Sequence, residues 1–182
     1  MKQLSYYLFD TPLGVCGIMW KDPEATGGQP VVTSLQLPEA TEKSTEERIA
    51  VMSQRVSPPP PYIAEIAEKV RRHLSGKAQD FSAVSVDLDG VGSFAQQVYA
   101  ACRNIPAGRT MSYGELATTI NHPGAARAVG QALGRNPFPI LVPCHRVLTA
   151  DGKAGGFSAY GGVETKVRIL AIEGVTIKRK RT

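Results

Sequence analysis

The sequence predicts an α+β protein in which a mixed α/β first half precedes a helical second half. Alternating and β-branched apolar runs, which are typical of strands, occupy the first forty residues. Apolar residues at helical spacing recur from residue 63 onward. Clusters of proline and glycine separate these runs. A chain of 182 residues is long enough for one domain or two small ones.

Three strands are expected in the first half. Residues 4–9 and 15–20 are apolar runs joined by a turn that contains proline and glycine, which predicts a hairpin. Residues 31–37 alternate and are β-branched, so they form the third strand. The stretch 21–30 before it is a surface loop. Cys16 lies in the second strand, where we expect a half-buried, structural residue.

Two helices are expected next. The first covers residues 45–54, with Ser44 as its cap. Four consecutive prolines at 58–61 then favour an extended spacer. The second helix is predicted by apolar residues at helical spacing, namely Ile63, Ile66, Ala67, Val70 and Leu74. Gly76 ends this helix, and His73 near its C-terminus is expected to be solvated.

The second half opens with two predicted helices. Ser93 is expected to cap the first. Its apolar face is formed by Phe94, Val98, Ala101, Cys102 and Ile105. Cys102 lies on this face, which favours a structural role. Ser112 and Glu115 have the spacing of a capping box, so they open a second, short helix.

A third helix is expected over residues 124–133, where Pro123 can start it and Gly134 ends it. Two short helices joined by a tight turn are typical of a helix-turn-helix, although helical hairpins without a DNA-binding role share the pattern. The small residues of this helix allow close approach to a partner. Its one long cation is Arg127, for which an ordinary solvated charge is the alternative interpretation.

The last helix is expected to bury Val167, Leu170 and Ala171 and to end at Glu173. A carboxylate in the last turn is unfavourable beside the negative end of the helix dipole. Glu173 therefore either faces solvent or has a partner such as an imidazolium. The glycine-rich stretch 149–162 lies before this helix. It either supplies backbone N–H donors and a wall for a planar ligand, or it is a flexible surface loop.

Charge is distributed unevenly along the chain. Residues 1–92 carry nine Lys and Arg against twelve Asp and Glu, a net charge of −3, whereas residues 93–182 carry twelve against four, a net charge of +8. The second half is therefore expected to meet a polyanion, of which nucleic acid is the leading candidate.

The cysteines and the N-terminus indicate the compartment. Three scattered cysteines fit a reducing compartment, and neither they nor the three histidines have the spacing of a zinc site. The first twenty residues lack a continuous apolar core, so neither a signal peptide nor a membrane span is expected there. The protein is expected to be cytoplasmic, or nuclear in a eukaryote.

The most informative stretch is residues 143–147, Pro-Cys-His-Arg-Val, at the end of a proline-stiffened apolar segment. A free cysteine is mostly protonated near neutral pH, and neighbouring His and Arg side chains can lower its pKa. Cys144 is therefore a candidate nucleophile. A buried structural cysteine beside a surface basic pair is the alternative.

Together, these motifs resemble the O6-alkylguanine-DNA alkyltransferase family, also called methylated-DNA–protein-cysteine methyltransferases. The matching segments are SFAQQVY (93–99), IPAGRTMSYGELA (105–117), ARAVGQALGRNPFPILVPCHRV (126–147) and GGVETKVRILAIEG (161–174). From the first of these segments to the last, the resemblance spans about eighty residues, nearly all of the second half. The run from Asn136 to Val147 is highly specific, whereas the first half matches only in size and strand pattern.

The resemblance implies an RNase H-like α/β domain over residues 1–90. An all-helical domain over residues 91–176 carries the helix-turn-helix and the active-site cysteine, and a basic tail covers residues 177–182. The implied activity is direct-reversal DNA repair, an irreversible, single-turnover transfer of an alkyl group from O6-alkylguanine in DNA to Cys144. The base must flip out, because a stacked guanine cannot present its alkyl carbon to a sulfur. The implied partner is double-stranded DNA, bound through its minor groove by a monomer, with neither metal nor cofactor.

The same resemblance implies roles for five residues in the chemistry. Cys144 accepts the alkyl group. His145 takes the thiol proton through a water, and Glu173 orients and charges the imidazole. Tyr113 hydrogen-bonds the leaving guanine and offsets the charge that grows on it. Asn136 holds the turn that positions the thiol.

DNA contacts are implied for seven further residues, namely Ala126, Arg127, Ala128, Gly130, Arg135, Arg146 and Ser158. Arg127 fills the space left by the flipped nucleotide while the small-residue helix lies in the minor groove. This placement differs from the usual major-groove reading by a helix-turn-helix. Ser158 and Phe157 border the base.

Two positions depart from the family pattern. The loop between Cys144 and Gly161 is about two residues longer than in the family, with Ala159 and Tyr160 as the insertion. The width of the base pocket therefore does not follow from the resemblance. Tyr99 stands where the family often has Trp, which is a change in packing.

Two other function classes compete with this interpretation. The first is a non-enzymatic lesion sensor that binds alkylated DNA, and proteins of that kind typically have Trp in place of the cysteine. The second is a Cys-His hydrolase, in which the glycine-rich loop supplies an oxyanion hole. A hydrolase gives no role to Arg127 or to the basic second half.

Overall fold

The computed structural model describes residues 4–23 and 28–177. The chain divides into two compact units, Met1–Leu88 and Asp89–Thr182. The basic tail expected over residues 177–182 lies outside the described residues from residue 178 onward. In the part of the chain that the structure describes, no helix combines the length and the apolar content needed to cross a bilayer.

The first unit is built on a four-stranded sheet in the order β3-β2-β1-β4. β1 (Leu4–Thr11) and β2 (Gly14–Lys21) form the predicted hairpin, and β3 (Val31–Gln36) pairs antiparallel with β2. β4 (Ser53–Arg55) pairs parallel with β1. This last strand was not expected, because three polar residues carry no apolar alternation.

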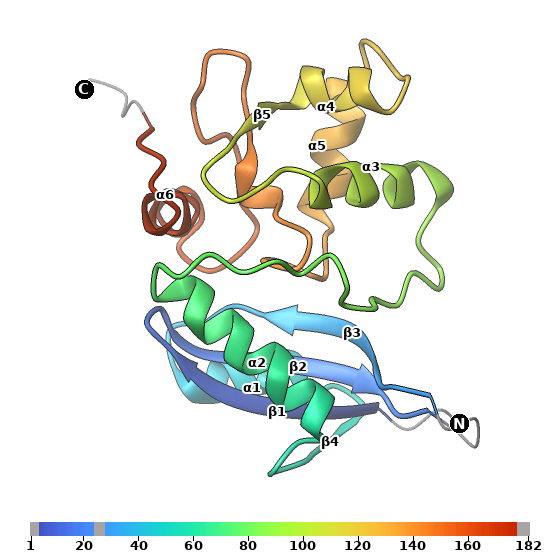
Figure 1. The fold of residues 1–182 in the computed structure, drawn as a ribbon, viewed down its shortest axis with the longest axis vertical. Helices are drawn as coiled ribbons and strands as arrows, with labels where there is room; N and C mark the ends of the chain where they lie inside the picture. The colour runs from blue at the N-terminus through green and yellow to red at the C-terminus, as the bar shows by residue number, and fades with distance from the viewer. Residues whose placement is uncertain (1–3, 24–27, 178–182) are drawn as a thin grey trace. The chain divides into compact units, whose positions relative to one another are not determined.

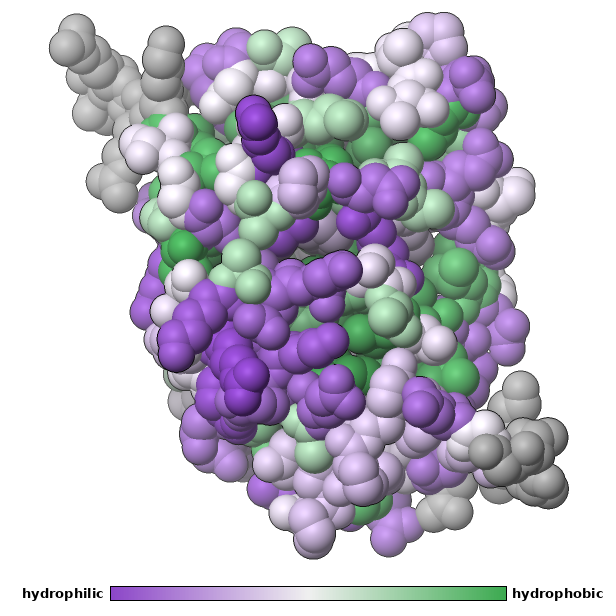
Figure 2. All heavy atoms as spheres, viewed as in Figure 1, coloured by the Kyte–Doolittle hydropathy of each residue, from purple (hydrophilic) through white to green (hydrophobic). Residues whose placement is uncertain are grey.

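Two helices pack on the sheet, and Figure 1 shows α2 (Pro61–Leu74) in front of it and α1 (Glu42–Ile49) behind it. The buried end of α1, Ile49, packs on buried residues of β1. Gly17 makes this approach possible, because a Cβ there would lie 2.8 Å from Ile49 Cδ1. The outward face of α2 is polar (Figure 2). On this helix Glu68 forms ion pairs with Arg71 and Arg72.

The predicted helix over residues 45–54 begins earlier and ends earlier than expected. Thr41 caps it instead of Ser44, since Thr41 Oγ1 accepts the N–H of Ser44 at 3.1 Å. The helix ends at Ile49, and the chain turns at Met52, whose φ is +54°, before it enters β4. A single capping side chain, that of Thr41, four residues before the expected start, therefore sets the boundary.

Two side chains of the first unit are more buried than the sequence predicted. Cys16 is fully buried rather than half-buried. His73 is buried rather than solvated, because its Nδ1 accepts the N–H of Gln79 at 3.1 Å and its ring meets Phe81 edge-on. The segment after α2 therefore folds back over the helix end.

The second unit contains α3 (Ser93–Arg103), α4 (Tyr113–Thr119), α5 (Ala126–Gly134) and α6 (Val163–Ile172). α5 packs on both α3 and α4. The capping box is confirmed: Ser112 Oγ accepts the N–H of Glu115 at 3.1 Å, while the Glu115 carboxylate accepts the N–H of Ser112 at 2.7 Å. Cys102 is fully buried in α3, as predicted.

The second unit is not all-helical, which corrects the expectation. β5 (Met111–Ser112) and β6 (Val147–Leu148) pair in parallel. Two-residue strands are too short to show alternation in a sequence. Their pairing ties the start of α4 to the segment directly after the 3₁₀ turn η1 (Cys144–Arg146).

Helix boundaries in this unit also differ from those expected. The N-cap residue of α3 is Gly92, and Ser93, which was expected to cap this helix, is its first residue. α5 begins two residues later than predicted, because Gly124 has a φ of +85°, outside the helical range. The buried residues of α6 are Lys166, Ile169 and Leu170. Ala171 is exposed, so the inward face of α6 is rotated from the one expected.

Candidate active site

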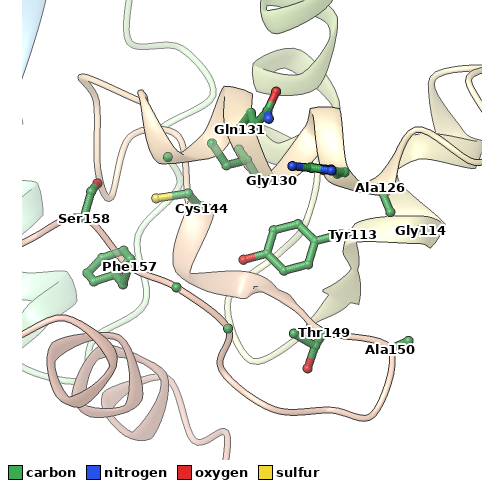
Figure 3. Close-up of a pocket in the computed structure, with 15 residues that line it drawn as sticks. Tyr113, Gly114, Ala126, Gly130, Gln131, Cys144, Thr149, Ala150, Phe157 and Ser158 are labelled. Atoms are coloured by element: carbon green, nitrogen blue, oxygen red, sulfur yellow. The ribbon is translucent and has the colours of Figure 1, made fainter.

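A pocket of about 790 Å³ opens in the second unit. Its wall comes from the start of α4, one face of α5, Cys144 of η1 and the loop 149–158. Figure 3 shows the Cys144 sulfur and the Tyr113 hydroxyl turned toward this space, with Phe157 and Ser158 on the side away from Ala126 of α5. The volume is within the range of small-molecule sites.

A tight turn fixes the segment before Cys144. The Asn136 side chain spans this turn: its Oδ1 accepts the N–H of Phe138 at 2.9 Å, and its Nδ2 donates to the carbonyl of Val142 at 2.9 Å. Ile140 has a φ of +71°, a conformation that costs a β-branched residue about 1–3 kcal/mol. Cys144 follows with 8% of its surface exposed, and it lines the pocket.

Burial raises the pKa of the Cys144 thiol, although hydrogen bonding by Asn136 and the positive charge of Lys166 act in the opposite direction. The prediction that the two basic neighbours in sequence lower this pKa is therefore wrong. Both of those neighbours bind Glu173 instead. The thiol is neutral at rest, so its reaction requires a base.

A buried cluster of three charged or ionisable side chains stands behind the thiol. Glu173 Oε1 lies 2.8 Å from His145 Nε2. Arg146 donates to both oxygens of the same carboxylate, from Nε at 3.0 Å and from Nη2 at 2.8 Å, and its Nη1 donates to the carbonyl of Ile105 at 2.5 Å. The side chains of His145 and Glu173 are each 1% exposed. Of the two alternatives that the sequence left for Glu173, solvent or an imidazole partner, the structure shows the second.

The same cluster corrects the prediction that Arg146 contacts DNA. Its side chain is 7% exposed, and its guanidinium is committed to Glu173 and a backbone carbonyl. Sequence reasoning missed this role because Arg adjacent to His in a basic half resembles a surface pair. The unfavourable placement of Glu173 at a helix end was the available signal, since a buried carboxylate there needs more than one donor.

The cluster also fixes the tautomer of His145. A carboxylate can only accept hydrogen bonds, so Nε2 carries the proton that faces Glu173. In the neutral imidazole, the lone pair is then on Nδ1, which is also buried. His145 is therefore arranged to take up a proton on Nδ1 while Glu173 stabilises the resulting positive charge.

Lys166 is a functional candidate that the sequence reasoning missed. Its residue is 1% exposed, and its Nζ donates to the carbonyl of Val147 at 2.6 Å, to Tyr113 Oη at 3.4 Å and to the carbonyl of Gly156 at 3.5 Å. Desolvation lowers its pKa to about 8. The available signal was its place on the apolar stripe of α6, three and four residues before Ile169 and Leu170.

Tyr113 begins α4 and carries its hydroxyl into the pocket (Figure 3). Burial raises its pKa, because desolvation disfavours the charged phenolate. The Lys166 ammonium lies 5.6 Å from the ring centroid. Gly155, at a φ of +65°, leaves room for the hydroxyl, because a Cβ there would lie 3.1 Å from Tyr113 Oη. The hydroxyl is thus a protonated donor inside the pocket.

The residues expected to contact DNA are only partly brought together. Arg127, Ala126 and Gly130 of α5 line the pocket, as does Ser158 from the opposite wall. Arg127 is exposed. Ala128 and Arg135 do not line the pocket; Arg135 is exposed at the C-cap of α5. Across the described residues, no three His, Cys, Asp or Glu side chains gather where they could hold a metal ion.

The fold and the site define a protein with a candidate nucleophilic cysteine in a pocket that a helix pair borders. Residues 93–175 match the family model described as 6-O-methylguanine DNA methyltransferase, DNA binding domain. Two relatives, both methylated-DNA–protein-cysteine methyltransferases, match most of the chain. The one from Methanothermobacter thermautotrophicus is 34% identical over 92% of this chain and 84% of its own length. The one from Mycolicibacterium paratuberculosis is 35% identical over 93% of this chain and 92% of its own length.

Solved structures agree with these matches. The crystal structure of Mycobacterium tuberculosis OGT in complex with DNA has a TM-score of 0.70 at 36% identity, over 93% of each chain. The O6-methylguanine-DNA methyltransferase from Pyrococcus kodakaraensis has a TM-score of 0.69 at 30% identity, over 95% of this chain and 100% of its own. The chain belongs to the methylated-DNA–protein-cysteine methyltransferase family.

Proposed function

We propose that this chain repairs O6-alkylguanine in DNA by transferring the alkyl group to Cys144 in one irreversible step. Family membership supports the class of reaction. The observation that carries the assignment to Cys144 is the position of its sulfur on the pocket wall, with the buried His145–Glu173 pair next to it in the same unit. The enzyme is a methylated-DNA–protein-cysteine methyltransferase.

The transfer exchanges one bond for another at the alkyl carbon. The Cys144 sulfur forms a bond to this carbon while the bond between the carbon and guanine O6 breaks. The thiol proton passes through a water to Nδ1 of His145, where Glu173 stabilises the imidazolium. The purine anion takes a proton from the Tyr113 hydroxyl, and the proton held on His145 returns to the phenol through solvent. The products are a thioether on the protein and unmodified guanine. Because the thioether is stable, each molecule reacts once.

Tyr113 and Lys166 act on the leaving guanine. Negative charge grows on the purine as the bond to O6 breaks, and a donor already in place stabilises it without reorganisation. The Tyr113 hydroxyl donates to the purine, and the Lys166 ammonium beside it stabilises the charge that shifts to the phenol oxygen. Asn136 is a positioning residue, since its two hydrogen bonds hold the turn before the thiol.

The DNA is double-stranded, and the alkylated nucleotide is extruded into the pocket by a monomer of the protein. Extrusion is required because the pocket thiol is 8% exposed and cannot reach a stacked base. The small residues Ala126, Ala128 and Gly130 allow α5 to lie in the minor groove. Arg127 fills the space that the extruded nucleotide leaves in the DNA double helix. Arg135 and Ser158 contact the strand on either side.

The two units have different tasks in this proposal. Residues 91–176 bind DNA and carry the acceptor thiol. Residues 1–90 form an RNase H-like domain that supports them, an assignment favoured by the strand order β3-β2-β1-β4 with one parallel pair at its edge. The repair reaction takes place in the cytoplasm, or in the nucleus of a eukaryote.

The test uses duplex DNA that carries one O6-methylguanine with a labelled methyl group. We expect label to move to the protein in a one-to-one ratio and to stop there. Cys144→Ala abolishes the transfer, whereas Cys102→Ala, a matched change at a buried cysteine of the same unit, retains it. Transfer by Cys144→Ala, or repeated turnover by the unaltered protein, contradicts the proposal.

The lesion-sensor alternative is not favoured, because a sensor has no need for a thiol in the pocket or for a buried base behind it. It predicts tight binding to the methylated duplex with no label on the protein. The hydrolase alternative predicts steady release of acid from an activated ester. A binding measurement with the methylated duplex tests the first alternative, and a separate assay with the ester tests the second.

A further inference from the structure

The chain exposes an aromatic side chain directly beyond the pocket wall. Phe157 and Ser158 line the pocket, and Tyr160 follows two residues later with 53% of its surface exposed. Val163, at the start of α6, is 45% exposed. In the described residues of the second unit, these two are the large apolar side chains left most open to solvent. Tyr160 is therefore an exposed aromatic side chain two residues after the pocket lining, which makes it a candidate contact residue.

The backbone that carries Tyr160 is held in one conformation. The N–H of Gly162 donates to the carbonyl of Ala159 at 2.9 Å, and Thr165 Oγ1 donates to the carbonyl of Tyr160 at 2.6 Å. Gly161 has a φ of +81°, and a Cβ there would lie 2.4 Å from Thr165 Oγ1. This position therefore requires glycine. The hydrogen bond from Thr165 joins this turn to α6, so the exposed Tyr160 side chain extends from a backbone that is held in place.

The position of Tyr160 beside the pocket indicates which partner it contacts. An extruded nucleotide remains joined to its neighbours, so the strand must cross the pocket rim on both sides. One side is α5, and the other is the segment with Phe157 and Ser158 (Figure 3). Arg127 of α5 is among the residues that line the pocket. A neutral phenol ring carries no charge that repels phosphate. Aromatic side chains bind the faces of nucleotides that have lost a stacking partner.

We infer that Tyr160 contacts the lesion-bearing DNA strand, with its ring packed against the nucleotide next to the extruded one. This inference rests on the proposed function and adds a binding residue to it. Tyr160 holds the strand outside the pocket, whereas Phe157 and Ser158 border the base inside it. Tyr160 therefore increases the rate of transfer from DNA and leaves the rate with a free base unchanged.

The test compares two substrates in single-turnover reactions. One is duplex DNA with a single O6-methylguanine, and the other is free O6-benzylguanine, which has no flanking strand. In Tyr160→Ala, the ratio of the duplex rate to the free-base rate falls about fivefold or more, the lower end of base–aromatic stacking. Tyr160→Phe keeps the ratio near that of the unaltered protein. Met52→Ala, at an exposed apolar residue of the first unit, is the matched control.

Three outcomes overturn the inference. An unchanged ratio in Tyr160→Ala shows that the ring does not contact the strand. An equal loss with both substrates shows that the ring shapes the pocket itself. A loss in Tyr160→Phe equal to that in Tyr160→Ala shows that the hydroxyl, not the ring face, is responsible. Failure of the unaltered protein to react with either substrate contradicts the proposed function instead, so the two failures are distinct.

Discussion

Replacing Glu173 by Gln tests the buried cluster behind the thiol. The change removes the negative charge that both His145 and Arg146 contact. Removing one partner of a buried ion pair costs about 3–5 kcal/mol, because the other charge is left uncompensated. Arg146 is 7% exposed but keeps its bond to the carbonyl of Ile105, so we expect the lower end, about 3 kcal/mol, as the loss in the free energy of unfolding.

The same variant loses rate as well as stability. Without the carboxylate, the imidazolium that forms on His145 is no longer stabilised, and general-base assistance is worth about 100-fold or more. Urea unfolding measures the first effect, and single-turnover transfer from methylated duplex measures the second. Glu164→Gln, an exposed change in the first turn of the same helix, is the matched control and costs at most about 1 kcal/mol. A Glu173→Gln variant within about 1 kcal/mol of the unaltered protein and within about threefold of its rate refutes the reasoning.

Three further predictions address other parts of the site. The pKa of Lys166 is lowered to about 8, so the unfolded state binds more protons above that pH, and the free energy of unfolding rises by up to about 3 kcal/mol toward pH ~10. Urea titrations at pH ~8 and pH ~10 measure this increase in the free energy of unfolding, and Lys166→Met removes it. An increase that persists in the variant contradicts the burial of a charged lysine. Arg127→Ala slows repair of duplex more than repair of single strands in single-turnover assays, and equal slowing counts against the gap-filling role. Ser112→Ala lowers the free energy of unfolding by about 1 kcal/mol through loss of the helix cap, and an unchanged urea midpoint contradicts this.

Elements with a strong local pattern were predicted from the sequence. The hairpin of β1 and β2 and the apolar stripe of α2 each repeat over several residues, and the structure confirms them. The capping box of Ser112 and Glu115 is confirmed as well, since its two hydrogen bonds join residues three apart. These features are local, so the sequence alone contains their cause.

Features that depend on distant partners were not predicted. β4, β5 and β6 exist because another strand lies beside each of them. His73 is buried because the chain after α2 returns over it, and Arg146 is buried because Glu173 and Ile105 supply its acceptors. No pattern near these residues records those contacts.

The candidate site divides in the same way. The Pro-Cys-His-Arg-Val motif indicated Cys144 as a candidate nucleophile, with a structural cysteine as the alternative. The carboxylate at a helix end left either solvent or an imidazolium partner open for Glu173. The pairing with His145 was implied by the family resemblance, and the structure shows it. The direction of the thiol pKa was wrong, because burial depends on residues far away in the sequence. The place of Lys166 among its three acceptors was missed for the same reason.

The most direct test of the account is to locate the methyl group after reaction. The protein is incubated with duplex containing one O6-methylguanine and digested, and its peptides are sequenced by tandem mass spectrometry. The account predicts one added methyl group per molecule, on the sulfur of Cys144, together with an equal amount of restored guanine in the DNA. Guanine restored without a methyl group on this peptide, or a methyl group on another residue, contradicts it.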